Sequence, residues 1–386
     1  MKHLLLLKSL DICTNVYYSM PIMKLNIRTI IVCLCFVVSY MTAAAQKTNQ
    51  QDPARYILKY DTAFSGIGPT IYFLPLPRSK EDVLVDDLDK LDDFNDAIRQ
   101  AFLYQDLLKS FAPTTNCAEV TEIIKVKAIA VEDWQKASQD QLDSNNQEVA
   151  IGILNALAKQ CILKQETDKA ELLLTKALAI ATKEEKIVDI DIILSNLSSV
   201  YFYNKNFLEA GKTEEAYYKA AILEKSIINQ GKSLVRIATI LAFDKDYNAA
   251  ESTIIRKAIP LFNKAKDFDS KINAWVKLAK IYQLYNRHPE AQWFLLQAKE
   301  LSALKNITTY NTDIEYMLGY SKFIQNNLIV SQKELTGALS LAQKEGNKYI
   351  ELSAIQLLGQ ISTKQNRMLE AEQFLLSYWK LRNELF

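Results

Sequence analysis

A chain of 386 residues has room for one long domain or two ordinary ones, and its 9 glycines and 8 prolines are few enough to favour helices. The formal net charge is +1, and without the first 45 residues the chain carries 42 basic and 44 acidic side chains. This near-neutral balance gives no electrostatic reason to expect a nucleic-acid partner.

Residues 1–45 have the layout of a leader with a secretory signal peptide, and Met23 is the expected start. Lys24 and Arg28 form a basic flank, residues 29–41 are an apolar run, and residues 43–45 are three alanines. The apolar run is short for a membrane span, and an uncleaved anchor is the alternative. We expect cleavage after the alanines, export to the periplasm or beyond, and no membrane span in the mature chain.

Two cysteines, Cys117 and Cys161, lie beyond the leader. An oxidising compartment would allow them to pair, but two cysteines cannot form a disulfide framework. Buried free thiols are the preferred interpretation, and pairing stays open.

Residues 46–110 are expected to form an N-terminal segment that is partly extended and partly helical. Glycines and prolines recur from Gly66 to Pro77 and stop helices, so an extended stretch packed on the first helices is expected there. Residues 81–96 contain seven aspartates but lack the central glycine of a calcium loop. Because Leu88 and Leu91 recur there at helical spacing, we predict a helix with a solvated acidic face.

A 40-residue period recurs six times over residues 148–386. The reference position of each unit is a small residue, and a second small residue follows 12 positions later. The first set is Ala158, Ser198, Ala238, Ala279, Gly319 and Gly359, and the second is Ala170, Ala210, Ala250, Ala291, Ser331 and Ala371. Helices approach closely only where no large side chain intervenes, so each period predicts two packed helices joined by polar turns. The third unit has one extra residue, between Ala250 and Ala258.

One unit carries most of the tetratricopeptide (TPR) pattern. The matching residues are Trp275, Leu278, Ala279, Tyr282, Ala291 and Ala298, with Leu295 where Phe is usual. The unit resembles a TPR, although the period is 40 and not 34. The longer period is similar to the repeat regions of bacterial peptide-sensing regulators, ATP-dependent transcription activators and sensor histidine kinases.

This resemblance implies an all-α fold, a right-handed α-solenoid of about six TPR-like helical hairpins over residues 148–386. Residues 111–147 are expected to form a degenerate repeat or a cap, because repeat stacks need atypical ends that shield the apolar face.

The sequence contains few of the residues that enzymes commonly use for catalysis. Only one histidine, His288, follows the leader, so a His-based triad or a metal cluster lacks its ligands. No phosphate loop or dinucleotide fingerprint occurs. We therefore expect no enzyme, no cofactor and no metal site.

The resemblance places a binding site on the concave surface, which the first helix of each TPR unit lines. TPR proteins that hold a partner's terminal carboxylate use a five-residue clamp, and its counterparts here, with the first pair in swapped order, are Asn155, Lys159, Asn196, Lys232 and Arg236. Lys280, Tyr316 and Tyr320 lie further along the same surface. The expected function is an exported, non-catalytic scaffold that binds a protein or peptide. The alternative is the sensory module of a signalling system whose output domain is on another chain.

Overall fold

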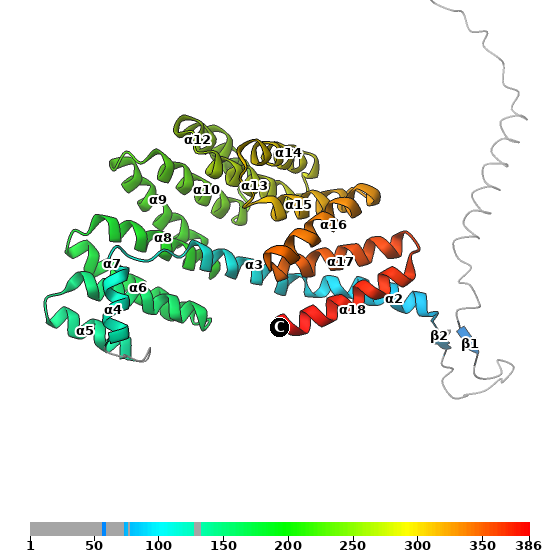
Figure 1. Cartoon of the computed structure of the whole chain (residues 1–386), viewed down its shortest axis with the longest axis horizontal. Helices are drawn as coiled ribbons and strands as arrows, with labels where there is room; N and C mark the ends of the chain where they lie inside the picture. The colour runs from blue at the N-terminus through cyan, green and yellow to red at the C-terminus, as the bar shows by residue number, and fades with distance from the viewer. Residues whose placement is uncertain (1–55, 59–72, 76–77, 127–132) are drawn as a thin grey trace, which may run out of the picture. The chain divides into compact units, whose positions relative to one another are not determined.

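The computed structural model describes residues 56–58, 73–75, 78–126 and 133–386 (Figure 1). The chain divides into two units, Met1–Ser79 and Lys80–Phe386. In the first, strands β1 (Tyr56–Leu58) and β2 (Phe73–Pro75) pair antiparallel. The predicted leader and most of the predicted extended stretch lie outside the described residues.

The second unit begins with short helical elements. These are α2 (Lys80–Asp89), the 3-10 helix η2 (Lys90–Phe94), α3 (Asn95–Ser110), α4 (Cys117–Val126) and α5 (Trp134–Asp143). Leu88 and Leu91 of the acidic segment are buried, whereas Asp82 and Asp89 are exposed.

Six helical hairpins follow, in which consecutive helices pack on one another. The first three are α6 (Gln147–Leu163) with α7 (Thr167–Lys183), α8 (Ile187–Tyr203) with α9 (Phe207–Leu223), and α10 (Ile227–Phe243) with α11 (Tyr247–Thr253), η4 (Ile254–Ala258) and α12 (Ile259–Ala265). The last three are α13 (Phe268–Leu284) with α14 (His288–Lys305), α15 (Asn311–Ile324) with α16 (Leu328–Glu345), and α17 (Lys348–Lys364) with α18 (Met368–Leu385). The predicted right-handed α-solenoid is confirmed.

The 40-residue period is built from two nearly equal halves. A residue in the left-handed conformation follows each helix from α5 to α17, with α11 to α12 counted as one, and successive ones are 20 residues apart except for one step of 21. They are Asn145, Gln165, Glu185, Lys205, Lys225, Lys245, Lys266, Asn286, Asn306, Asn326, Gly346 and Asn366. Five of these twelve are Asn, which tolerates this conformation better than most side chains. A typical half is a 17-residue helix such as α6, followed by a three-residue turn.

The 21-residue step falls in the third unit, where the extra residue was predicted. The five residues Ile254–Ala258 form a π-helical turn between α11 and α12. Such a turn takes in one residue without ending the helix. Ala250 and Ala258 therefore both reach the core, each fully buried.

The small reference residues are the contact points between paired helices. Ala158, Ala238 and Ala279 are fully buried, and so are their partners Ala170, Ala250 and Ala291. Where serine takes one of these places, its hydroxyl bonds across the contact: Ser198 Oγ donates to the Ala210 carbonyl at 3.1 Å and Ser331 Oγ to the Gly319 carbonyl at 2.8 Å.

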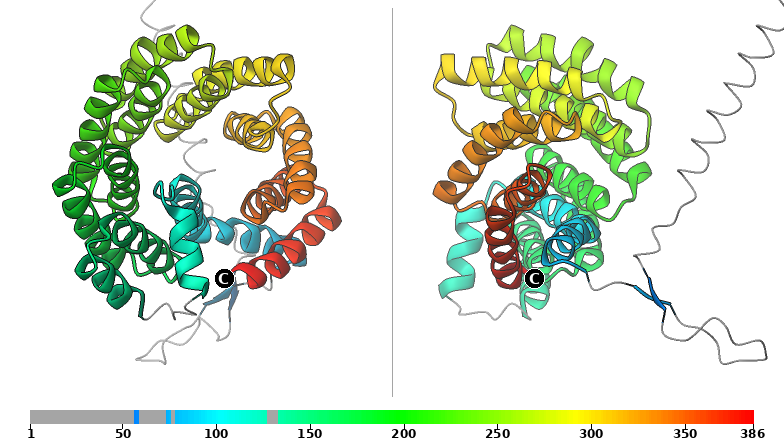
Figure 2. Two further views of the ribbon diagram at one scale, coloured as in Figure 1. Left: turned by 60° about the vertical axis from the view of Figure 1, so that its left-hand side comes forward. Right: turned by 90° about the vertical axis from the view of Figure 1, so that its right-hand side faces the viewer.

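The N-terminal helices connect the two ends of the stack. Figure 2 shows the hairpins of this unit following a curve, with α3 between the first and last pairs. Helix α2 packs on α17 and α18, and α3 packs on both α8 and α17. None of the helices within residues 78–126 and 133–386 combines the length and apolar character required to cross a bilayer.

Replacing Gly319 tests the close approach of α15 and α16. A Cβ atom there would lie 2.6 Å from Leu335 Cγ and 3.1 Å from the Leu335 nitrogen. We expect Gly319→Ala to lower the free energy of unfolding by about 1–3 kcal/mol, because the overpacking exceeds the gain in helix propensity of roughly 1 kcal/mol. Gly337→Ala in α16 is the control, since its Cβ meets no atom within 4 Å. Urea unfolding followed at 222 nm should show opposite shifts, and equal shifts would contradict the packing argument.

Candidate peptide-binding groove

The concave side of the stack carries a segment of the chain itself. We call Lys80–Asn116, which includes α2, η2 and α3, the strap. Its hydrogen bonds to the repeats come from α6, α8, α13 and α17, each the first helix of its pair. These first helices therefore line the inside, as in a TPR groove.

Two buried amides hold the backbone of one strap residue, Ala112. Asn196 accepts the Ala112 N–H at 2.8 Å and donates Nδ2 to the Ala112 carbonyl, also at 2.8 Å. Asn155 donates Nδ2 to the same carbonyl at 3.1 Å, and its own oxygen accepts from Asn196 Nδ2 at 2.9 Å. Asn155 is 2% exposed and Asn196 is 0% exposed. The pair, which we call the amide grip, binds main-chain groups, so it does not depend on the side chain of Ala112.

Residues on either side of Ala112 are also fixed. Phe111, next to it and extended, is buried in the cluster that contains Leu107, Leu154 and Leu197. The Thr115 N–H and Oγ1 both donate to Asp189 Oδ1, at 2.9 and 3.0 Å.

The other end of the strap packs on the last hairpin. Leu88 fills the space left by Gly359, where a Cβ would lie 2.8 Å from Leu88 Cδ2. Gln356 and Gln360 donate to Asp92 Oδ1 at 2.9 and 3.2 Å. Both glutamines lie on α17, the first helix of the last hairpin.

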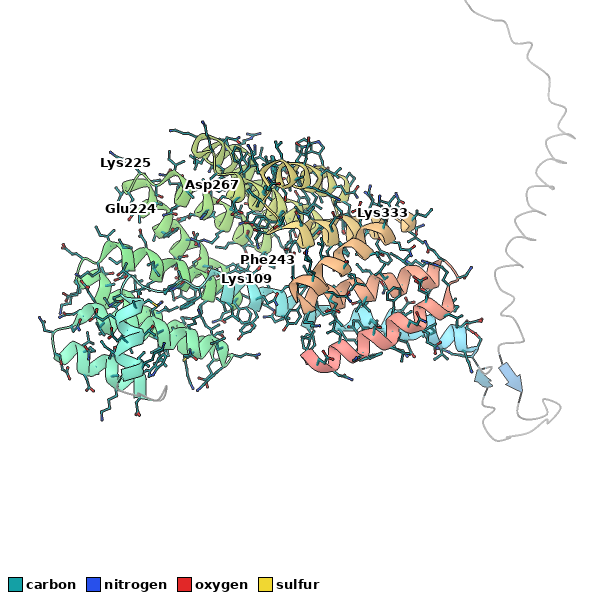
Figure 3. All side chains as sticks on the ribbon, in the orientation of Figure 1. Lys109, Glu224, Lys225, Phe243, Asp267 and Lys333 are labelled. Carbon is teal, nitrogen blue, oxygen red and sulfur yellow. The ribbon has the colours of Figure 1, made fainter. Side chains whose placement is uncertain are left out.

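The middle of the groove carries cations with free bonding capacity. Lys277 pairs with Asp106 of the strap at 3.1 Å. Among the described residues, Lys280 and Lys109 form neither an ion pair nor a hydrogen bond. Desolvation and the nearby Lys277 lower the pKa of Lys280, and desolvation raises the pKa of Asp313. Figure 3 marks Lys109 on α3, in the centre of the drawing, with Glu224 and Lys225 at the outer edge.

Three of the five clamp counterparts already have partners within the chain. Asn155 and Asn196 form the amide grip. Arg236 pairs with Glu214, which is 0% exposed, at 2.8 Å from Nη2 and 3.0 Å from Nε, and donates Nη1 to Ser195 Oγ at 2.8 Å. Lys159 and Lys232 are exposed.

The two groove tyrosines are half-buried and belong partly to the core. Tyr316 and Tyr320 pack against the cluster of Leu335, Leu357 and Ile361. Burial raises the pKa of Tyr316 to about 12. Tyr320 also contacts His288 edge to face, with ring centroids 5.9 Å apart.

Sequence reasoning missed the strap and the Glu214–Arg236 pair. Glu214 stands where the second unit lacks an expected apolar residue, and a buried carboxylate needs a cation nearby. This departure from the pattern is the signal that could have found the pair. The contacts between Ala112 and the two asparagines could not be predicted from the repeat, because they occur once and do not recur with the 40-residue period.

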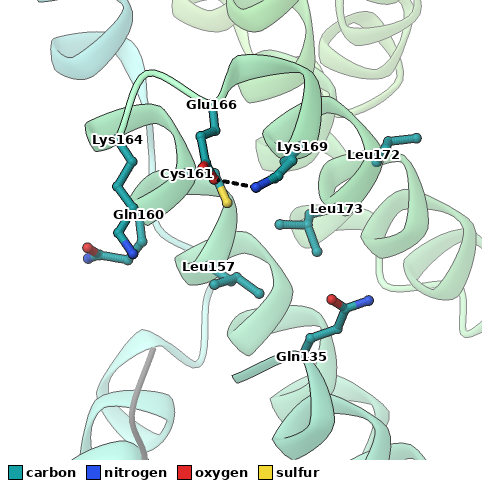
Figure 4. Close-up of a pocket in the computed structure, with 9 residues that line it drawn as sticks. All are labelled: Gln135, Leu157, Gln160, Cys161, Lys164, Glu166, Lys169, Leu172 and Leu173. Carbon is teal, nitrogen blue, oxygen red and sulfur yellow. Dashed lines mark ion pairs between the residues drawn. The ribbon is translucent and has the colours of Figure 1, made fainter. Parts of the chain in front are cut away.

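A pocket of about 380 Å³, separate from the groove residues described above, lies where α6 ends and α7 begins (Figure 4). It contains Cys161 and the exposed ion pair of Lys169 and Glu166 at 3.0 Å. Burial raises the pKa of the Cys161 thiol, the opposite of what a nucleophilic cysteine requires. Cys161 and the exposed Cys117 are both free thiols.

His288 is a core residue at the start of α14. It is 4% exposed, and its Nδ1 lies 3.4 Å from Ser321 Oγ. Burial lowers its pKa, which favours the neutral ring. Within the described residues, no group of three or more His, Cys, Asp or Glu side chains could hold a metal ion.

No protein-family model matches the chain, and no curated protein matches its sequence. Among solved structures, the chain is similar to a signal-transduction ATPase with a tetratricopeptide-repeat sensor from Pyrococcus horikoshii, with a TM-score of 0.50 and 15% identity over 65% of this chain. The match covers 42% of that protein, so the chain spans less than half of its length.

Lower TM-scores relate the chain to the apo form of RapI, at 0.46 with 10% identity over 67% of this chain and 99% of that one, and to aspartyl phosphate phosphatase F from Bacillus subtilis, at 0.44 with 11% identity over 80% and 96%. At these identities the likeness is one of fold. The chain is a TPR-like helical-repeat protein.

Arg236 supports the fold from inside the groove. Arg236→Ala leaves the buried Glu214 carboxylate without its cation, so we expect a loss of about 3–5 kcal/mol in the free energy of unfolding. The double variant Glu214→Gln with Arg236→Ala should recover much of this loss. The exposed Lys232→Ala is the control, and chemical denaturation should show it near wild type. An Arg236→Ala protein as stable as Lys232→Ala would show that the pair is dispensable.

Asp191 makes stability depend on pH. Burial and the neighbouring Glu224 carboxyl raise the pKa of Asp191 to about 7. Asp191 therefore stays protonated in the folded chain while it ionises in the unfolded one, so its contribution to stability falls as the pH rises from about 4 to about 7. Asp191→Asn should remove this loss and raise the melting temperature at pH 8 relative to wild type. The exposed Asp244→Asn should leave the pH profile unchanged, and identical profiles for wild type and Asp191→Asn would refute the assignment.

Proposed function

We propose that the chain is an exported, non-catalytic scaffold that binds a protein or peptide along its first helices. The observation that carries this proposal is the amide grip, in which two buried side chains satisfy the N–H and the carbonyl of one backbone residue. Side chains placed in this way recognise an extended chain whatever its sequence.

The middle of the groove supports a partner with an acidic group. Lys280 and Lys109 have no ion-pair partner among the described residues, and charge-assisted hydrogen bonds to a carboxylate are stronger than neutral ones. Tyr316 and Tyr320, one helical turn apart on α15, add aromatic rings on the next first helix.

The alternative proposal is a sensory module whose output lies on another chain. It uses the same groove and differs in the consequence of binding. The fold likeness to a protein whose repeats are named a sensor keeps this alternative open.

A peptide library tests the proposal. Random decapeptides displayed on phage are selected on the chain from Gln46 to Phe386, and the selected peptides are titrated by fluorescence anisotropy. We expect acidic extended peptides, and Lys280→Gln should weaken binding by about tenfold, which is roughly 1.4 kcal/mol. Added salt should weaken it further.

Lys176→Gln, on the exposed side of α7, is the matched control and should bind like wild type. Failure to select any peptide, or equal affinities for wild type and Lys280→Gln, would contradict a binding site in the middle of the groove.

A further inference from the structure

The part of the strap around Ala112 lies in the groove as a peptide ligand would. Its backbone is extended at Phe111, and its N–H and carbonyl at Ala112 are held by side chains of two consecutive first helices, α6 and α8. Without the strap, Asn155 and Asn196 would face the open groove with each other and water as partners. Any segment that buries them again must supply a backbone N–H and carbonyl, because buried polar groups left unsatisfied are costly.

A segment other than the strap can also supply the backbone N–H and carbonyl that the amide grip binds. The amide grip reads main-chain atoms, and any extended residue with a free N–H offers the same two bonds. What distinguishes the strap is the pattern of its side chains. Phe111 enters the apolar cluster, and Thr115 places a hydroxyl on Asp189, which is 3% exposed.

The strap does not fill its surroundings. A cavity of about 350 Å³ lies beside it, lined by Phe111, Pro113 and Thr114 of the strap, by Trp134 of α5 and by Asn155 of α6. An incoming segment with larger side chains at the places of Pro113 and Thr114 would bury apolar surface that the strap leaves unused.

We propose that residues 110–116 are a built-in competitor for the groove, and that the partner presents an extended segment with an aromatic residue, then a small residue, then a hydroxyl residue three positions later. This inference rests on the proposed function and adds where an extended partner enters and what it must displace. The rest of the strap stays in place, because Asp106 and Asp92 hold it to α13 and α17. Release is therefore local, between α3 and α4.

The test uses the full chain and a probe copied from it. The probe is a fluorescein-labelled peptide with the sequence of residues 110–116, acetylated and amidated so that its ends carry no charge. In wild type the tethered strap competes at an effective concentration in the millimolar range, so binding should be weak. Phe111→Ala removes the aromatic anchor but keeps every backbone bond, and it should bind the probe at least tenfold more tightly.

Two controls decide what the gain means. Adding Asn196→Ala to Phe111→Ala should abolish the gain, because the amide grip is lost. A probe with alanine in place of its phenylalanine should bind neither protein. A folded Phe111→Ala protein that fails to bind the probe, or a gain that survives Asn196→Ala, would overturn the proposal and show that the strap is only structural. Neither result would change the outcome of the library test, because that test uses the chain with its strap intact and measures the effect of Lys280→Gln on peptide affinity.

A second measurement on wild type tests the same proposal in case the Phe111→Ala protein does not fold. In wild type, hydrogen exchange at the Ala112 and Thr115 amides is followed with unlabelled peptide at several millimolar. Displacement should accelerate exchange at these two amides by several-fold while exchange in α13 stays constant. Unchanged exchange at saturating peptide would overturn the inference.

Discussion

The structure depends on the close contact of paired helices at small residues. Ala158 against Ala170, and the five equivalent pairs, let two backbones approach where larger side chains would hold them apart. Because this contact recurs every 40 residues, the inner faces of the first helices come into line. Asn155 and Asn196, 41 residues apart, thereby reach the same peptide group. The repeat thus creates the binding geometry before any ligand-specific residue is considered.

The interior that results is polar and cannot be left dry and empty. Asn155, Asn196 and Asp189 are at most 3% exposed, and each finds its partner on the strap. An apolar segment without free backbone groups would leave these side chains unsatisfied, at a cost of about 1–3 kcal/mol each. The strap therefore supplies the hydrogen-bond partners that these buried side chains of the first helices need. Any partner that takes its place must supply the same hydrogen bonds.

The sequence predicts the solenoid well because its signals are local and repeated. The small residues and the polar turns each mark one element of the structure. The extra residue before Ala258 marks the place where the structure has the π-helical turn of Ile254–Ala258, although the type of turn was not predicted. The strap could not be predicted in the same way, since its contacts join residues 43 to 272 positions apart and occur once each. The small residue Gly359 looked like an ordinary helix contact, yet it also makes room for Leu88.

The fate of the clamp residues shows why residue type and register do not settle a site. Asn155, Asn196 and Arg236 stand at clamp-like offsets, but two of them bind Ala112 and the third neutralises Glu214. A guanidinium that already shares its donors with a buried carboxylate and with Ser195 has fewer left for a ligand. Lys159 and Lys232 are exposed, whereas Lys280 is half-buried, and it lies further along the groove with Lys109. An acidic group on a partner is therefore expected to bind there, one unit beyond the position that the clamp pattern indicates.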